Sequence, residues 1–209
     1  MNSDMNMNKG WKKWMVYVGV ILFTFHFSLF ISSCSSDSED EGEYDNWQER
    51  NEAMTAKWAT DSSLGKIISF SKEVNSSSKI SDYIYVEKIA SGEGEGDTPL
   101  YTDTVRVAYR GRLIPSKSYP EGLVFDENYS GDFDWKTVGT TDFCCSALVD
   151  GFTTALMYMK PGDRWRVRIP YQLGYGTSAK NSIPAYSDLI FEVALVDFWH
   201  PGEQHSKFK

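Results

Sequence analysis

Residues 149–198 decide the fold of this chain, and they read VDGFTTALMYMKPGDRWRVRIPYQLGYGTSAKNSIPAYSDLIFEVALVDF. The first part carries apolar side chains at the i, i+3, i+4 and i+7 spacing of one helix face: Phe152, Ala155, Leu156 and Met159. Asp150 stands just before this pattern, where its side chain can accept a hydrogen bond from the first helical turn as the N-cap. We therefore expect one short helix at the start of this stretch.

After the helix the pattern changes to that of β-strands. Lys160-Pro161-Gly162-Asp163 predicts a turn, because proline presets φ at the second position and glycine allows a positive φ at the third. The next residues alternate between two sets on opposite faces of a strand: Trp165, Val167 and Ile169 against Arg164, Arg166 and Arg168. A second run of this kind spans residues 189–198. We therefore expect residues 149–198 to form one short helix beside half-buried antiparallel strands.

Further strands are expected before the helix. Residues 83–89 alternate, whereas residues 64–74 fit either a second short helix or a strand. In residues 105–113 the two faces again differ, with Val105, Val107, Tyr109 and Leu113 on one and Arg106, Arg110 and Arg112 on the other. We interpret the outward arginines as a solvated face paired with acids such as Glu87 and Glu192. A nucleic-acid surface is disfavoured, because the chain has a net charge of −8.

These motifs, in this order, resemble those of the FKBP-type peptidyl-prolyl cis-trans isomerases. The similar segments are VRVAYRG at residues 105–111, VFD at residues 124–126, and GF…AL..M.PGDRWRVRIP…GYG……IP..SDLIFEVAL within residues 149–198. The resemblance covers about residues 103–198. It implies an α+β fold, in which an FKBP-like antiparallel β-sheet wraps around one short α-helix, and an activity on X-Pro peptide bonds.

The resemblance also implies where the substrate pocket lies. Its lining would be Tyr109, Phe125, Asp126, Val149, Phe152, Tyr175, Ile183 and Phe191, with Phe152 as the floor. The Tyr175 hydroxyl would donate a hydrogen bond to a substrate carbonyl, and the backbone N–H of Val149 would be a further donor. Phe133 or Trp135 would add another aromatic edge.

A plain hydrophobic core is the alternative interpretation of these positions. Taken singly, the three phenylalanines fit a core as well as a pocket. The polar atoms of Tyr109, Asp126 and Tyr175 favour a pocket, because a polar group at an apolar site needs a partner or a ligand.

The sequence departs from the family pattern at three places. Phe152 stands where the family usually has tryptophan, so we expect a deeper and less selective pocket. Residues 114–124 and residues 139–146 are longer than the corresponding family segments, and the second of these is expected to reshape a pocket edge.

Other chemistries lack their residues in the expected domain. His26 lies in the leader, and His200 and His205 lie at the C-terminal end, so we expect no histidine in the folded body, which removes histidine-dependent nucleophile pairs and most zinc sites. Cys144 and Cys145 are adjacent, and we expect two unpaired thiols, with a strained vicinal disulfide as the alternative in an oxidising compartment. Neither a metal nor a cofactor is predicted. Prolyl isomerisation needs none of these groups.

Residues 1–33 resemble a bacterial lipoprotein signal peptide. A basic segment with Lys9, Lys12 and Lys13 precedes a mostly apolar run at residues 16–31, which is shorter than a membrane-spanning helix. Ile31-Ser32-Ser33-Cys34 resembles a lipobox, which implies that Cys34 is lipidated and begins the mature chain. An uncleaved membrane anchor is the alternative. The lipobox implies a lipid-anchored protein in the outer membrane of a Gram-negative bacterium, on its periplasmic face or the cell surface.

Residues 34–43 are polar and acidic, and we expect a disordered tether there. The acidic run resembles the surface-export signals of Bacteroidetes lipoproteins, although a plain solvated linker fits it nearly as well. A helical extension is expected over residues 44–79, with a largely aromatic stripe at Tyr44, Trp47, Asn51, Met54 and Trp58. We expect this stripe to lie against the following domain, with self-association through residues 44–62 as the alternative.

The predicted organisation is a signal peptide (1–33), a tether (34–43), a helical extension (44–79), an FKBP-type isomerase domain (80–200) and a tail (201–209). The expected function is isomerisation of X-Pro bonds during the folding of exported proteins. Its partners would be proline-containing polypeptides and, through Cys34, a membrane; nucleic acid is not expected. The alternative function is a catalytically weak, FKBP-like protein- or peptide-binding module of an outer-membrane assembly.

Overall fold

The computed structural model describes residues 42–92 and 97–203. The predicted signal peptide, Cys34 and nearly all of the predicted tether therefore lie outside the described residues. Among the helices in these two ranges, none has the length and apolar character required to cross a membrane.

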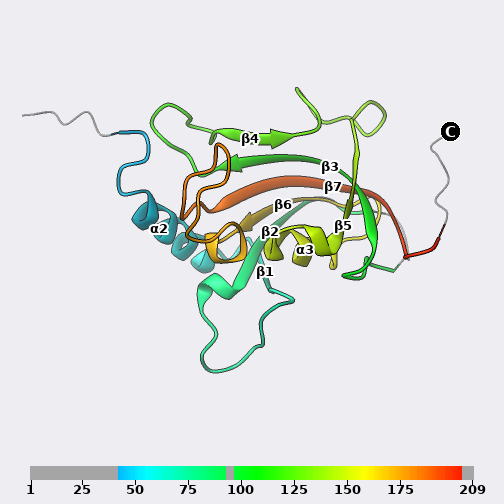
Figure 1. Ribbon diagram of the computed structural model, residues 1–209, viewed down its shortest axis with the longest axis horizontal. Coiled ribbons are helices and arrows are strands. Elements are labelled where there is room, and N and C mark those ends of the chain that lie inside the picture. Colours follow the sequence, from blue (N-terminus) through cyan, green and yellow to red (C-terminus); the bar gives the residue numbers. More distant parts are fainter. Residues whose placement is uncertain (1–41, 93–96, 204–209) are drawn as a thin grey trace, which may run out of the picture. The chain divides into compact units, whose positions relative to one another are not determined.

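Seven antiparallel strands form one sheet within these residues (Figure 1). They are β1 (Gly65–Ile68), β2 (Tyr83–Ala90), β3 (Thr104–Leu113), β4 (Val124–Glu127), β5 (Thr141–Cys144), β6 (Arg164–Ile169) and β7 (Leu189–Trp199). The strand order is β1-β2-β6-β7-β3-β4, and β5 pairs with β3 beside β4. The ambiguous segment at residues 64–74 thus contains a strand, β1.

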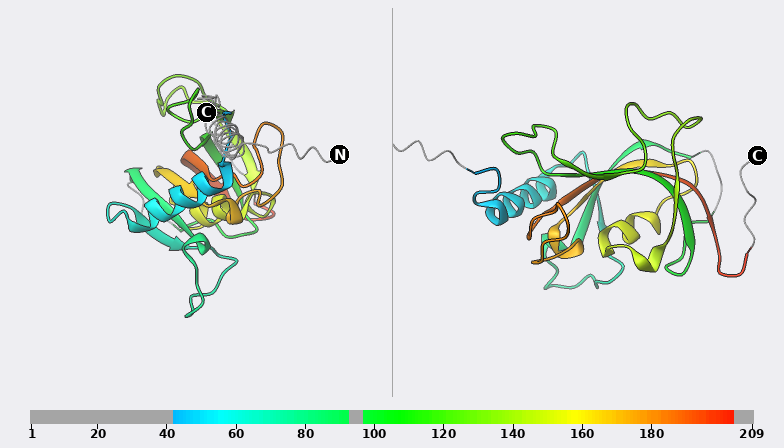
Figure 2. Two further views of the ribbon diagram at one scale, coloured as in Figure 1. Left: turned by 90° about the vertical axis from the view of Figure 1, so that its left-hand side faces the viewer. Right: turned by 45° about the horizontal axis from the view of Figure 1, so that its top comes forward.

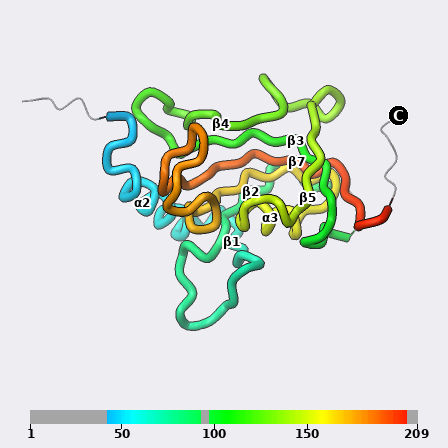
Figure 3. The backbone as a smooth tube through the Cα atoms, in the orientation of Figure 1, coloured from blue at the N-terminus to red at the C-terminus, as the bar shows by residue number. Residues whose placement is uncertain are grey.

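Within the described ranges, two α-helices accompany the sheet, α2 (Trp47–Thr60) and α3 (Asp150–Leu156), together with three short 3-10 turns. The turns are η1 (Ile80–Asp82), η2 (Cys145–Ala147) and η3 (Tyr171–Leu173). The sheet curves around α3, and α2 lies at the end of the sheet where β7 begins (Figures 2 and 3). The predicted fold class, an antiparallel sheet around one short helix with a helical N-terminal extension, is confirmed.

The central helix α3 is buried on every side, because Gly151 to Leu156 are all buried. A Cβ atom at Gly151 would lie 2.3 Å from Cγ2 of Ile169, so glycine allows α3 to approach β6 this closely. The predicted N-cap was wrong. Asp150 is the first helical residue and Val149 is the N-cap. The Asp150 carboxylate instead accepts a hydrogen bond from the Ser71 hydroxyl at 2.6 Å.

The predicted turn after α3 is confirmed. Asp163 N–H donates to the carbonyl of Lys160 at 2.9 Å, and Gly162 has a φ of 92°. In β6 the three apolar residues are buried and the three arginines are half-buried, as the alternation predicted. The turn and the strand therefore follow from local sequence.

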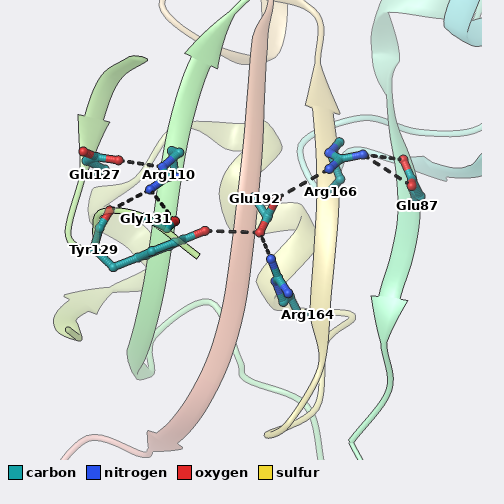
Figure 4. Close-up of polar contacts among 8 residues, drawn as sticks. All are labelled: Glu87, Arg110, Glu127, Tyr129, Gly131, Arg164, Arg166 and Glu192. Carbon is teal, nitrogen blue, oxygen red and sulfur yellow. Dashed lines mark hydrogen bonds and ion pairs between the residues drawn. The ribbon is translucent and has the colours of Figure 1, made fainter. Parts of the chain in front are cut away.

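The outer face of the sheet carries the expected ion pairs (Figure 4). Glu87 accepts from Arg166 at 3.3 Å and from Arg168 at 2.8 Å. Glu192 pairs with Arg164 and Arg166. The arginines thus lie in a network with acids on neighbouring strands, which agrees with the interpretation of a paired face.

The helix α2 is joined to the start of β7 by buried hydrogen bonds. The Trp47 indole N–H donates to the Ser187 hydroxyl, and the Thr55 hydroxyl donates to the Asp188 carboxylate, each at 2.8 Å. The backbone N–H of Asp188 donates to the side-chain oxygen of Asn51, also at 2.8 Å. Burial raises the pKa of Asp188 to about 7, against the opposing effect of the Thr55 hydrogen bond.

The predicted stripe therefore lies largely against the chain's own domain. Trp47, Asn51 and Trp58 are buried, and Met54 is partly buried against the core. Tyr44 is the exception: it precedes α2 and is 37% exposed. Asn51 looked like an interruption of an aromatic stripe, but its amide is a buried contact between helix and strand.

The long loop at residues 114–124 forms hydrogen bonds with the N-terminal extension. Arg50 donates to the backbone carbonyls of Glu43, at 3.0 Å, and Pro115, at 3.2 Å. The Glu43 carboxylate accepts from the backbone N–H of Ser118 at 3.2 Å. The extra length of this loop thus places it against the segment that enters α2.

Candidate active site

A cavity of about 400 Å³ opens between α3 and the inner face of the sheet. It is lined by Tyr109, Phe125, Asp126, Phe143, Ala147, Leu148, Val149, Phe152, Tyr175, Lys180 and Phe191. All but one of the eight predicted site residues are in this lining. The sequence-based prediction therefore located the cavity, although the catalytic roles of these residues remain predictions.

The aromatic walls come from four separate elements that the fold brings together. Phe152 of α3 lies with its ring centre 4.7 Å from that of Phe191 in β7 and 6.3 Å from that of Tyr109 in β3. Phe125 of β4 contacts Phe191 edge to face at 5.4 Å. A Cβ atom at Gly111 would lie 2.5 Å from Phe125 and 2.7 Å from Phe191, so glycine at this position allows the two rings to meet.

Two tyrosine hydroxyls provide polar groups in the apolar cavity. The Tyr109 hydroxyl donates a hydrogen bond to the Asp126 carboxylate at 2.9 Å. The pKa of Tyr109 is raised mainly by burial and, to a smaller extent, by this hydrogen bond. Burial, with a smaller contribution from the charge of Asp126, also raises the pKa of Tyr175. Both hydroxyls thus remain protonated at neutral pH.

The hydroxyl of Tyr175 is available to a ligand. Its side chain is 37% exposed, and the hydroxyl makes no hydrogen bond to any residue that the structure describes. The backbone N–H of Val149, at the N-cap of α3, likewise has no acceptor in the described ranges. Both groups are therefore free donors beside aromatic walls.

Ile183 is the predicted site residue that does not line the cavity. It is buried in the core at 5% exposure. Its backbone exchanges two hydrogen bonds of 2.9 Å with Lys180, which does line the cavity. Ile183 therefore holds the loop that carries Lys180 and does not contact the cavity itself.

The predicted aromatic edge from Phe133 or Trp135 was wrong. Phe133 lies on the outer face of the sheet, with the Arg164 guanidinium 4.2 Å from its ring centre, and it contacts Trp135. The edge is supplied instead by Phe143 of β5, whose ring centre is 5.7 Å from that of Tyr109. Phe143 falls in the segment at residues 139–146 that was expected to reshape a pocket edge.

Sequence reasoning missed Phe143, Ala147, Leu148 and Lys180 in the lining. The alternation of Thr141 to Cys144 was the available signal for Phe143, since it places this residue on one face of a short strand. Lys180 is an exposed loop residue, and no periodic pattern in the sequence indicates its position at the cavity.

One histidine does belong to the folded part of the chain, contrary to the prediction. His200 follows β7, and its Nδ1 lies 2.9 Å from the buried Asp103 carboxylate. It does not line the cavity. Cys144 is exposed and Cys145 is buried, both as free thiols, and burial raises the pKa of Cys145 to about 12, which keeps this thiol unreactive.

An aromatic cavity between a short helix and an antiparallel sheet is the arrangement of an FKBP-like domain. Comparison with known proteins supports the same class. Residues 96–196 match the model of the family described as FKBP-type peptidyl-prolyl cis-trans isomerase. The macrophage infectivity potentiator of Trypanosoma cruzi is 30% identical over 189 residues, which cover 90% of this chain and 87% of that protein. This chain belongs to the FKBP-type peptidyl-prolyl cis-trans isomerase family.

Other relatives match over a shorter region. The FKBP-type 22 kDa peptidyl-prolyl cis-trans isomerase of Escherichia coli is 37% identical over 107 residues, which cover 50% of this chain and 46% of that protein. This chain thus spans less than half the length of that relative. Among solved structures, FkpA from Escherichia coli has a TM-score of 0.52 at 20% identity, covering 94% of this chain and 75% of FkpA. At that identity the likeness concerns the fold.

Proposed function

We propose that this chain catalyses cis/trans isomerisation of X-Pro bonds in proline-containing polypeptides, and that its clients are exported proteins during folding. The observation that carries the proposal is the aromatic cavity of Phe152, Phe191 and Tyr109, with the free hydroxyl of Tyr175 at its edge. Family membership supports the same activity.

The mechanism we propose uses containment and hydrogen bonding. Amide resonance imposes a rotational barrier of ~18–20 kcal/mol. Transfer of the amide into an apolar cavity removes water that stabilises the polarised planar form, and aromatic walls hold the bond in a twisted conformation. Hydrogen bonds from Tyr175 and the N–H of Val149 to substrate carbonyls keep the chain in place. Weakening of the resonance by ~7 kcal/mol would accelerate rotation about 10⁵-fold.

The test is an exchange assay on X-Pro peptides with the full chain. We expect acceleration, with hydrophobic residues preferred before proline, and little dependence on pH near neutrality because no histidine lines the cavity. Tyr175→Phe should lower kcat/KM only about fivefold, since one neutral hydrogen bond contributes ~1 kcal/mol. Tyr158→Phe, at an exposed tyrosine outside the cavity lining, is the matched control.

The second candidate function is a binding module with little turnover. The smaller Phe152 at the expected tryptophan position favours it, because a looser floor would hold a substrate without twisting it. Binding of proline-containing chains by well-folded protein, without acceleration for any of several X-Pro peptides, would establish this alternative and exclude the enzyme.

We also propose that Cys34 is lipidated and anchors the mature chain to the outer membrane, with the acidic residues that follow as a tether. The support is the lipobox-like Ile31-Ser32-Ser33-Cys34 after a basic segment and a short apolar run. Self-association through residues 44–62 has weaker support, because Trp47 and Trp58 are already buried against the chain's own residues.

Lipidation is tested by the mass of the protein from membranes of an expressing Gram-negative cell. We expect a chain that begins at Cys34 and carries an acyl mass increment, and Cys34→Ala should abolish both the increment and membrane partitioning. Cys144→Ala is the control for the loss of an exposed cysteine. An unmodified chain that retains residues 1–33 would contradict the proposal.

A further inference from the structure

A second cavity lies on the outer face of the sheet, the face turned away from α3. Its volume is about 320 Å³, and the loop at residues 114–124 forms one side of it. The lining residues are Arg110, Arg112, Pro115, Pro120, Glu121, Arg166, Ile190 and Glu192. It thus combines charged groups with apolar walls, and it shares no residue with the aromatic cavity.

Most charges around this cavity are matched by strand register. Glu127, Arg110, Glu192, Arg166 and Glu87 stand opposite one another on five successive strands, with alternating sign. Figure 4 shows these side chains along the outer face. Each arginine of this row lies between two acids, and opposite charges on facing strand positions stabilise a sheet. This row therefore has no unmatched charge to offer a ligand.

Arg112 differs from the other outward arginines. Its partners in the register are Val124 and Ile190, which carry no charge. Its guanidinium donates to the carbonyl of Gly122 at 3.3 Å and makes no ion pair with any residue the structure describes. Each of the other five outward arginines forms an ion pair with an acidic side chain; these are Arg106, Arg110, Arg164, Arg166 and Arg168. The cavity thus contains an unmatched cation.

We propose that this cavity binds the carboxylate of an aspartate or glutamate side chain in an extended polypeptide partner. A guanidinium fork matches a carboxylate in shape and charge. Pro115, Pro120 and Ile190 provide apolar contacts for neighbouring side chains of the partner. Glu121 and Glu192 also line the cavity, and their negative charge repels a doubly charged phosphate more strongly than a singly charged carboxylate.

The experiment measures fluorescence anisotropy of a proline-free peptide, Gly-Leu-Glu-Leu-Gly-amide, whose N-terminus is acylated by an uncharged coumarin fluorophore, with the full chain. The blocked ends leave the glutamate as the source of charge, and the absence of proline separates this site from the isomerase site. A second probe replaces glutamate with glutamine. We expect Arg112→Gln and the glutamine probe each to weaken binding about tenfold or more. Arg112→Lys should retain part of the affinity.

The controls separate a built site from general electrostatics. Lys72→Gln removes one exposed positive charge outside the cavity and should leave binding unchanged. The proposal also requires unchanged isomerase activity and melting temperature in Arg112→Gln. Equal affinity for the two probes, no detectable binding of the glutamate probe, or an equal loss in Lys72→Gln would each overturn it. Displacement of the probe by inorganic phosphate more readily than by acetate would assign the cavity to phosphate and also overturn it.

Discussion

Phe152→Ala is expected to remove most of the isomerase activity and to lower the free energy of unfolding by ~3–5 kcal/mol. Phe152 is buried, and its ring meets both Phe191 and Tyr109. Truncation would leave a void beneath the substrate and remove the surface against which an X-Pro bond is held. The loss in kcat/KM should therefore be about tenfold or more, which exceeds the loss expected for one hydrogen bond.

Stability and rate have to be separated in this experiment. The exchange rate is measured at a temperature where chemical denaturation shows that the variant is folded. Trp135→Ala is the control, because Trp135 is an exposed aromatic residue outside the cavity and its loss should leave both quantities nearly unchanged. A folded Phe152→Ala protein with wild-type kcat/KM would contradict the assignment of Phe152 as the pocket floor.

Trp58→Ala is expected to lower the free energy of unfolding by ~3–5 kcal/mol, although Trp58 lies in the extension. Its side chain is only 6% exposed, and its ring centre lies 6.4 Å from that of the buried Tyr85 in β2. Removal of the indole opens a void between α2 and the sheet. It also weakens the attachment of a helix whose polar contacts are concentrated on residues 187–188.

The measurement is urea denaturation of the full chain beside its solution mass. Lys57→Ala, at the neighbouring exposed position on the same helix, should change stability little. The mass in solution should show the same oligomeric state for Trp58→Ala as for the wild type, because the stripe is buried within one chain. A wild-type dimer that becomes a monomer in the variant, with unchanged unfolding of the subunit, would instead favour self-association through α2.

The elements that the sequence predicts well are those whose pattern is local. The alternation of β6 and the proline–glycine turn before it are encoded by adjacent residues, and both are found as expected. Most of the candidate cavity was also located, because the family resemblance places its residues on known elements. These predictions needed no information on contacts between distant segments.

The errors concern residues whose position depends on distant partners. The pairing of β5 with β3 decides which phenylalanine, Phe133 or Phe143, reaches the cavity. In this pairing Phe143 stands opposite Val105. Asp150 was expected to cap its own helix, but the hydroxyl of Ser71 is available to it from a remote segment. Asn51 appeared as a defect in a stripe because its acceptor role toward Asp188 cannot be read from spacing.

The strand order has a consequence for a protein proposed to handle unfolded chains. At one margin of the sheet the outermost strand is β1, which pairs with β2. At the other margin β4 and β5 each pair with a part of β3. These three strands, β1, β4 and β5, have only four residues each. A long free edge offers a row of unpaired backbone groups on which another chain can extend the sheet. At the first margin β1 pairs with Tyr83–Val86 of β2, so Glu87–Ala90 also lie at the edge, but each of these edge segments is only four residues long and leaves little such template. A client that arrives in an extended conformation is therefore poorly able to add to this sheet and draw the protein into an aggregate.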